Sequence, residues 1–222
     1  VNASWQSALL GPVSTDARIT PENQRIEGVV QADLGNLDLP FPEDEKARAA
    51  MMNIAKAFGA SKFDLEVVLP AKDARTGAVT ITRQGDPALE AVVSLARKKD
   101  ETSVASVGTK AVIPLTAVRE FLPDTIQAEG TAAVDATVPM DAKQFEARVD
   151  LAQASLRLGE YVSKAPGDSA TADVLAARVK DAWKPQTVTI HYGGEDIVAR
   201  FEDDRIVSDF DVEMASFQNL FA

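Results

Sequence analysis

The sequence TIQAEGTAAVDATVPM, residues 125–140, decides the fold because it alternates between two kinds of residue along its whole length. Its even positions are apolar except for Gly130, and its odd positions are mostly polar or acidic. This period of two is typical of a β-strand that buries one face. Strands usually have only about 5 or 6 residues. We therefore expect either a strand that bends or one long apolar wall.

The same alternation recurs through most of the chain, and clusters rich in Pro, Gly, Asp and charge separate the alternating stretches. Strands that follow one another through such turns most simply form an antiparallel meander. The sequence predicts a mainly β fold, organised as a single β-rich module over residues 1–222. We expect about ten strands, the clearest of them at residues 25–35, 63–70, 89–96, 103–114, 125–140, 145–158, 186–193, 196–201 and 205–214.

The phase of the alternation changes inside FEARVDLAQASLRL, residues 145–158. Odd positions are apolar up to Leu151, and even positions are apolar from Ala154 onward. One extra residue near Ala152 or Gln153 would return the apolar residues to one face, which is what a β-bulge does. The sequence predicts a bulge and a bend there.

Two segments have helical spacing instead. Residues 43–58 place apolar residues three and four apart, with acids at the front and Gly59 behind, which predicts an amphipathic helix. Residues 115–122 also have their apolar residues at helical spacing, and Pro123 follows them, so the sequence predicts a short helix there. The stretch SKAPGDSATAD, residues 163–173, is the best candidate for a surface loop.

Charge and cysteine content exclude several classes of function. The chain has 23 basic and 34 acidic residues, a net charge of −11, so nucleic acid and anionic membrane surfaces fit its overall field poorly. It has no cysteine, which excludes disulfides and thiolate metal sites. It opens at Val1 without a start methionine or an apolar leader, so we expect a piece of a longer protein whose anchor or export signal lies upstream.

Catalytic and metal motifs are sparse, and we expect no cofactor, no metal site and no enzymatic activity. His191, the single histidine, could be a general base, but a strand residue beside the Gly193 turn is favoured. The acids at 202–204 could bind a hard cation, but a solvated turn is favoured. GGED, residues 193–196, reads as a hairpin turn. Met51 and Met52 are expected to pack rather than to form a cofactor site.

The inward residues of the long strand are mostly Ala, Gly and Val, where a dry core would contain Leu, Ile and Phe. Small side chains leave room, and acyl chains lying against them could supply the missing volume. A packed core remains the alternative interpretation of the same residues.

Residues 112–180 resemble the AsmA-like proteins of the Gram-negative envelope. In that family a helical Leu-Pro segment leads into a strand with a Gly, then a second patterned strand, and then a Lys-Pro-Gly turn and an Ala-containing strand. This chain departs from the pattern at Ala165, between the lysine and the proline, and lacks the usual Trp before the lysine. The residues that carry the resemblance are Leu122, Pro123, Gly130, Asp150, Leu151, Ala154, Leu156, Leu158, Lys164, Pro166, Gly167 and Ala172.

The resemblance implies an antiparallel sheet curled into a U-shaped groove or half-pipe that carries phospholipid across the periplasm, in a parent protein anchored in the inner membrane. It implies no catalytic residues. Phospholipid is the expected partner, with other envelope proteins as further partners and membrane contact through parts of the parent chain outside this sequence. Parity along the strands then gives the expected lipid-binding residues: Val30, Leu65, Val67, Ile126, Ala128, Ala132, Val134, Ala136, Val138, Met140, Val149 and Leu151.

Two other hypotheses stay open. The chain could be a structural or protein-binding β-module whose apolar faces pack fully on each other. It could also be a hydrolase that uses His191 or Asp203, although no pattern in the sequence favours this hypothesis strongly.

Overall fold

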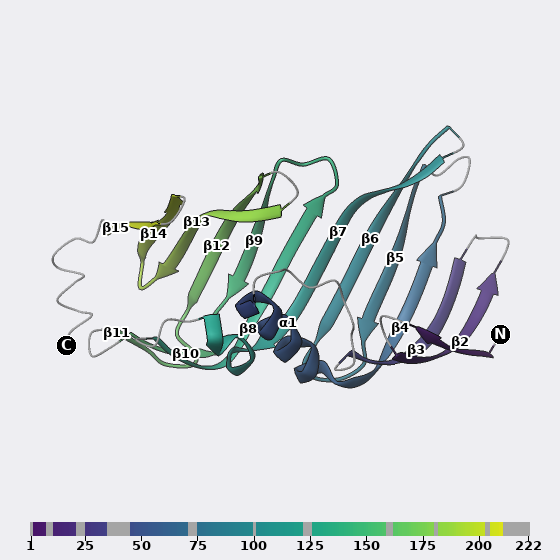
Figure 1. The fold of residues 1–222 in the computed structure, drawn as a ribbon, viewed down its shortest axis with the longest axis horizontal. Helices are drawn as coiled ribbons and strands as arrows, with labels where there is room; N and C mark the ends of the chain where they lie inside the picture. The colour runs from purple at the N-terminus through teal and green to yellow at the C-terminus, as the bar shows by residue number, and fades with distance from the viewer. Residues whose placement is uncertain are drawn as a thin grey trace. The chain divides into compact units, whose positions relative to one another are not determined.

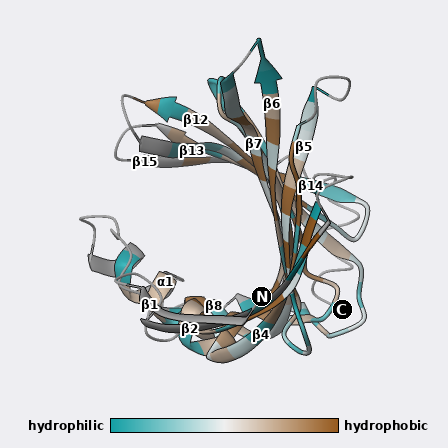
Figure 2. Ribbon diagram, turned by 90° about the vertical axis from the view of Figure 1, so that its right-hand side faces the viewer, coloured by the Kyte–Doolittle hydropathy of each residue, from teal (hydrophilic) through white to brown (hydrophobic). Residues whose placement is uncertain are grey.

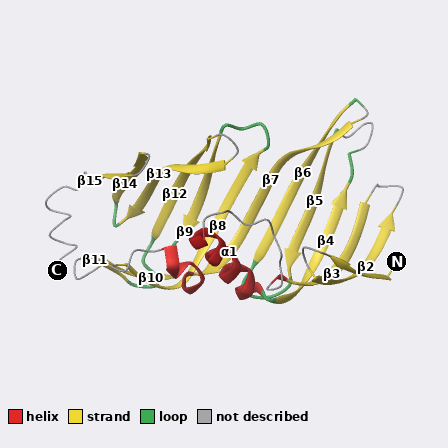
Figure 3. Cartoon of the chain, in the orientation of Figure 1, coloured by secondary structure: helices red, strands yellow, loops and turns green. Residues whose placement is uncertain are grey.

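The computed structural model describes residues 2–7, 11–20, 25–34, 45–70, 75–99, 101–121, 126–158, 162–179, 182–202 and 205–210. Strands dominate, as the yellow arrows of Figure 3 show, and the helical segments are few. The chain forms two compact units. Figure 1 colours the residues from purple at the N-terminus to yellow toward the C-terminus. Unit 1 comprises Val1–Ala111 and Pro139–Asp141, and unit 2 comprises Val112–Val138 and Ala142–Ala222.

Unit 1 is an antiparallel meander in which each strand pairs with the next strand along the chain. One α-helix, α1 (Glu45–Phe58), lies between its third and fourth strands in the sequence. The strand β7 starts in unit 1, where it pairs with β6 through Ala111. The strands are β1 (Asn2–Ser7), β2 (Gly11–Thr20), β3 (Arg25–Asp33), β4 (Ala60–Val68), β5 (Thr76–Arg83), β6 (Leu89–Lys98) and β7 (Glu101–Pro114).

Unit 2 is also antiparallel, with the strand order β8-β9-β12-β13-β14-β15 and a side branch in which β10 pairs with β8 and β11. A 3₁₀-helix, η3 (Leu115–Phe121), precedes β8. The strands are β8 (Ile126–Pro139), β9 (Gln144–Asp150), β10 (Ala154–Leu158), β11 (Val162–Lys164), β12 (Ala170–Val179), β13 (Ala182–Tyr192), β14 (Glu195–Glu202) and β15 (Arg205–Phe210).

These arrangements confirm a mainly β, antiparallel fold that is open rather than closed into a barrel. The estimate of about ten strands was too low, because the described residues form 15. The strands β1, β2, β5 and β12 and the three-residue β11 were not recognised as separate alternating stretches. The predicted surface loop is also shorter than expected, since β11 and β12 occupy both of its ends and leave exposed residues 165–169 between them.

Both predicted helices are confirmed, with α1 at Glu45–Phe58 and η3 at Leu115–Phe121. Gly59 has a positive φ of 51° and donates its N–H to Ala55 O, which ends α1 in the usual left-handed conformation. The expected packing of the two methionines is wrong. Met51 is 43% exposed and Met52 is 36% exposed.

The long alternating stretch is a single strand, β8, that bends at Gly130 (φ 87°) and changes its partner there. Gly130 pairs with Ala154 of β10, and Ala133 pairs with Asp150 of β9. Three steps along β8 therefore match four steps along its partners, so one extra residue is inserted in the turn at 152–153. This confirms the predicted bulge. Of the two alternatives for residues 125–140, the structure has the strand that bends.

Candidate functional site

A continuous row of branched apolar side chains crosses unit 1 at right angles to its strands. Each member pairs directly with the next member on the neighbouring strand, from β2 to β7. Because neighbouring strands lie about 4.8 Å apart, a row of this width is roughly 25 Å long. The row, called the unit 1 row below, consists of Ile19, Ile26, Val67, Val79, Val93 and Val107.

The chain itself covers the unit 1 row only in part. Ile19 is 56% exposed and Val107 is 40% exposed, and the members between them are half-buried. Figure 2 shows brown, hydrophobic residues along the middle of β5, β6 and β7. In the described part of unit 1 the buried hydrophobic side chains are Ala32, Phe58 and Phe63. None of these belongs to the row, so the row remains an accessible apolar surface.

Helix α1 is held against one end of this apolar face by Arg83. The Arg83 Nε donates to Ser61 Oγ at 2.8 Å, and its Nη1 donates to Pro87 O at 2.8 Å. Its guanidinium carbon lies 5.8 Å from the centroid of the Phe58 ring. These contacts fix the C-terminal end of α1 beside Phe63, so the apolar face is covered there and open at the unit 1 row.

Unit 2 has a shorter row on the apolar face of its own sheet. Its members pair directly from β8 through β9, β12 and β13 to β14. All are half-buried except Ala172, which is buried. The row, called the unit 2 row, consists of Val134, Val149, Ala172, Ile190 and Ile197.

Beside the unit 2 row the same face is packed rather than open. Leu115 of η3, Ala132 of β8 and Ala154 of β10 are 7%, 4% and 0% exposed and form one buried cluster. Because the strand residues in this cluster are alanines, η3 can lie close to the strands. The contact between η3 and the sheet therefore leaves little empty space. The partly buried residues packed against this cluster are Val118, Ala128, Val149, Leu151 and Leu156.

The expected lipid-binding residues are thus divided between different surroundings. Val30, Leu65 and Val67 share the apolar face of unit 1. In unit 2, Val134, Ala136 and Val149 lie on paired strands and Val138 is half-buried. Four of the twelve lie in or against the packed cluster: Ala128, Ala132, Val149 and Leu151.

The other two lie at the ends of the stretch. Ile126 pairs with Leu158 through the backbone, and its side chain is outside the described residues. Met140 follows the end of β8, where its N–H donates to Ala105 O, and its side chain is 51% exposed.

The expected lipid-binding residues did not include eight members of the two rows: Ile19, Ile26, Val79, Val93, Val107, Ala172, Ile190 and Ile197. A signal existed for Val79, because AVTIT, residues 78–82, alternates like the other strands. The continuity of the rows could not be read in this way, since it depends on the register between strands.

The opposite faces of both sheets carry the charges. In unit 1, a hollow of about 500 Å³ is lined by Asp16, Arg18, Glu27, Asp64 and Glu66, with threonines and backbone. In unit 2, a hollow of about 600 Å³ is lined by Asp135, Glu146, Arg148 and Asp173, together with threonines and the apolar residues Ala147, Val174 and Leu175. Each sheet is therefore amphipathic, with one apolar face and one charged face.

His191 joins three strands on the charged face of unit 2. Its Nδ1 lies 2.5 Å from Asp196 Oδ1 on β14, and its Nε2 lies 3.1 Å from Asp173 Oδ2 on β12. Only the protonated ring can donate both hydrogen bonds at once. The hydrogen bonds to Asp196 and, second, to Asp173 therefore raise the pKa of His191 above its usual value.

Because His191 is the single histidine of the chain, its pKa can be measured directly from its imidazole proton resonances. We expect a pKa above 6.5, with a larger fall in Asp196→Asn than in Asp173→Asn. The raised pKa stabilises the fold fully below about pH 6.5, and this contribution is lost as the pH rises through the raised pKa. A wild-type pKa at or below 6.5 would contradict the observed geometry.

The two turns considered for chemistry behave differently. Gly193 and Gly194 both have positive φ and connect β13 to β14, so the GGED stretch is a hairpin turn as predicted. Asp203 and Asp204 lie outside the described residues, although Glu202 and Arg205 on either side of them pair. Within the described ranges, no three or more His, Cys, Asp or Glu side chains are grouped to hold a metal ion.

Comparison of the chain with models of protein families, with curated proteins and with solved structures finds no match. In the part of the chain that the structure describes, no helix has both the length and the apolar character needed to cross a bilayer.

Proposed function

We propose that the chain is a non-enzymatic lipid-conduit module, which shields the acyl chains of phospholipid in an apolar groove during transport between the inner and outer membranes. The proposal places the module in the periplasm and takes its biological setting from the resemblance to AsmA-like proteins. It also requires that the apolar faces of the sheets, rather than their charged faces, contact the lipid.

The unit 1 row is the observation that supports this proposal best. Soluble proteins rarely leave a contiguous apolar surface uncovered unless it binds something. The row is continuous over six strands, and its ends Ile19 and Val107 are 56% and 40% exposed. An acyl chain placed on it would gain about 0.8 kcal/mol for each methylene removed from water. A row without interruption also lets a chain slide without a large barrier.

The packed cluster in unit 2 favours a second candidate, a structural or protein-binding β-module with a packed core. Ala154 is fully buried there, and η3 covers the strands. If the unit 1 row is covered in the same way by another protein, lipid has no access to it. The two candidates differ in what touches the unit 1 row.

A photo-crosslinking residue at Val107 distinguishes them, because this side chain belongs to the row and is exposed enough to be replaced. Ser106 is the matched control, since it is the preceding residue of β7 and faces the charged side. In cells with a Gram-negative envelope, with the chain in its natural context, we expect lipid attached at 107 and none at 106. Mass spectrometry of the crosslinked protein gives the readout.

Protein attached at 107, with no lipid, would replace the lipid proposal by the protein-binding candidate. Equal labelling at 106 and 107 would show that neither face is selective and would also count against the proposal. Circular dichroism of both variants must match that of the wild type before the comparison is made.

A further inference from the structure

His191 and the two carboxylates that it contacts lie on the charged face of unit 2, directly behind the unit 2 row. The three side chains, called the His191 bridge below, come from β12, β13 and β14, and the ring nitrogens lie 3.1 Å from Asp173 Oδ2 and 2.5 Å from Asp196 Oδ1. Each of the three is the chain neighbour of a member of the row, so the bridge and the row share the same strands on opposite faces. These neighbours are Ala172, Ile190 and Ile197.

The bridge changes when His191 loses its proton. The protonated ring donates from both nitrogens, whereas the neutral ring keeps one N–H. The Nδ1 proton is the one retained, because Asp196 is closer and lies directly opposite His191 in the register of β13 with β14. Nε2 then presents a lone pair to Asp173, so two acceptors face each other. Loss of the proton therefore breaks the contact between β13 and β12 and keeps the contact between β13 and β14.

Asp173 has a second cationic neighbour on its other side. Arg148 of β9 is directly opposite Asp173 in the antiparallel register, and oppositely charged residues in such a pair attract each other. Arginine stays charged across the physiological range of pH. The Asp173 side chain is 47% exposed, which leaves it room to turn. Its carboxylate can therefore pair with protonated His191 or turn toward Arg148.

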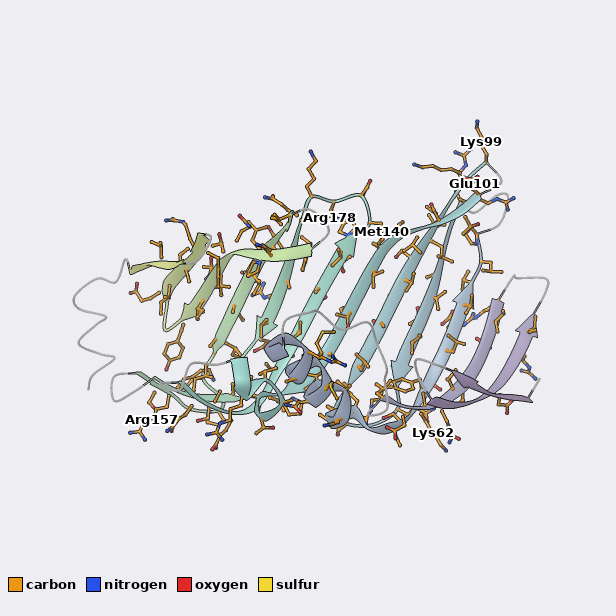
Figure 4. The ribbon with its side chains drawn as sticks, in the orientation of Figure 1. Lys62, Lys99, Glu101, Met140, Arg157 and Arg178 are labelled. Atoms are coloured by element: carbon orange, nitrogen blue, oxygen red, sulfur yellow. The ribbon has the colours of Figure 1, made fainter. Side chains whose placement is uncertain are left out.

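The other charged residues near the bridge lie at other positions of the register. Asp150 of β9 is separated from His191 by the width of β12, and Arg200 lies four residues from Asp196 along β14. Arg178 lies at the far end of β12, where Figure 4 labels it. His191 is the single histidine of a chain without cysteine, so its side chain has the ordinary pKa closest to neutrality. A change of pH near neutrality therefore acts on the bridge through His191.

We propose that the His191 bridge is a pH-sensitive latch that holds the β13–β14 hairpin to β12 when the ring is protonated and lets the hairpin open more often when the ring is neutral. The hairpin carries Ile190 and Ile197, so the latch regulates how well the unit 2 row holds an acyl chain. This regulation rests on the proposed function. The hydrogen bonds to Asp196 and, second, to Asp173 raise the pKa of His191, so the latch is engaged below about pH 6.5 and is released as the pH rises through the raised pKa.

The first test is hydrogen exchange of the backbone amides of β13 and β14 in the full chain between pH 5.5 and pH 9, corrected for the intrinsic pH dependence of exchange and referenced to the amides of β9. We expect exchange of the hairpin to rise by about fivefold with pH, the order expected for one exposed charge-assisted contact. The midpoint should coincide with the pKa of His191 measured from its imidazole resonances. His191→Gln and Asp173→Ala should abolish the rise and exchange at every pH as the wild type does at pH 9.

The matched control is Glu146→Ala, which removes one exposed carboxylate from the same charged face of unit 2. This control should keep the rise and its midpoint. The latch is overturned if the wild type shows no rise, if both bridge variants keep it, or if Glu146→Ala abolishes it as Asp173→Ala does.

The second test measures the effect on lipid by isoleucine methyl resonances during titration with dioctanoylphosphatidylcholine, whose charge is constant over this range of pH. Ile190 and Ile197 report on the unit 2 row, and Ile19 and Ile26 report on the unit 1 row. We expect binding at the unit 2 methyls to be about twofold weaker at pH 9 than at pH 5.5, with no change at the unit 1 methyls. Equal pH dependence at both rows would overturn the regulation and leave the proposed function standing. If the lipid shifts none of these methyls at either pH, the proposed function and its regulation are overturned, whereas the latch itself is decided by the exchange measurement.

Discussion

Replacing Gly130 with alanine is expected to destabilise unit 2 by about 3 kcal/mol or more, because two separate costs add. Gly130 has φ +87°, a conformation that residues with a Cβ rarely adopt. An added Cβ would also lie 2.3 Å from the backbone oxygen of Gln153. That oxygen belongs to the bulge turn and cannot move without disturbing the pairing of β8 with β10. Chemical denaturation followed by circular dichroism measures the loss.

Gly167→Ala is the matched control for this substitution. Gly167 has a similar φ of +98°, but a Cβ added there would meet no atom within 4 Å. The control therefore carries the conformational cost alone, of about 1–2 kcal/mol. If Gly130→Ala loses no more stability than Gly167→Ala, β8 and the bulge can move apart to admit the added Cβ. The close approach of Gly130 to the Gln153 oxygen would then not contribute to stability.

Local patterns predicted those parts of the fold that depend on neighbouring residues. Alternation over 125–140 identified β8, spacing identified α1 to within two residues at its start, and the phase change located the bulge. These features are encoded by residues only a few positions apart, so their physical cause can be read directly from the sequence.

The rows of apolar residues depend on the register between neighbouring strands, that is, on which residue pairs with which. Alternation within one strand does not specify this register. Val67 and Val79 were each consistent with an inward position, but only the pairing of β4 with β5 makes them neighbours. Contacts between residues far apart in the chain require the strand order and its bulges to be known first.

The turn at 152–153, which lies beside Gly130 of β8, is also where unit 2 buries a lysine side chain. Lys164 of β11 is only 3% exposed. Its Nζ donates to Ala154 O at 2.7 Å, to Ala165 O at 3.0 Å and to Ala152 O at 3.4 Å. An ammonium group has three donors, and here all three are directed at backbone carbonyls of the bulge and its neighbouring strand. Lys164 therefore ties β11 to the bulge.

Lys164→Met is the substitution that isolates this role, since it keeps a long unbranched side chain, one atom shorter than lysine, and removes the donors. We expect unit 2 to lose about 3 kcal/mol of stability, because hydrogen bonds to a charged group are lost and the buried Ala154 O is left without this donor. Lys184→Met, at an exposed site of β13, should change stability by less than about 0.5 kcal/mol. Denaturant unfolding of the three proteins gives the comparison. Equal midpoints in all three would mean that water satisfies these carbonyls as well as the ammonium does, and that the bulge is held by apolar packing around Ala154 alone.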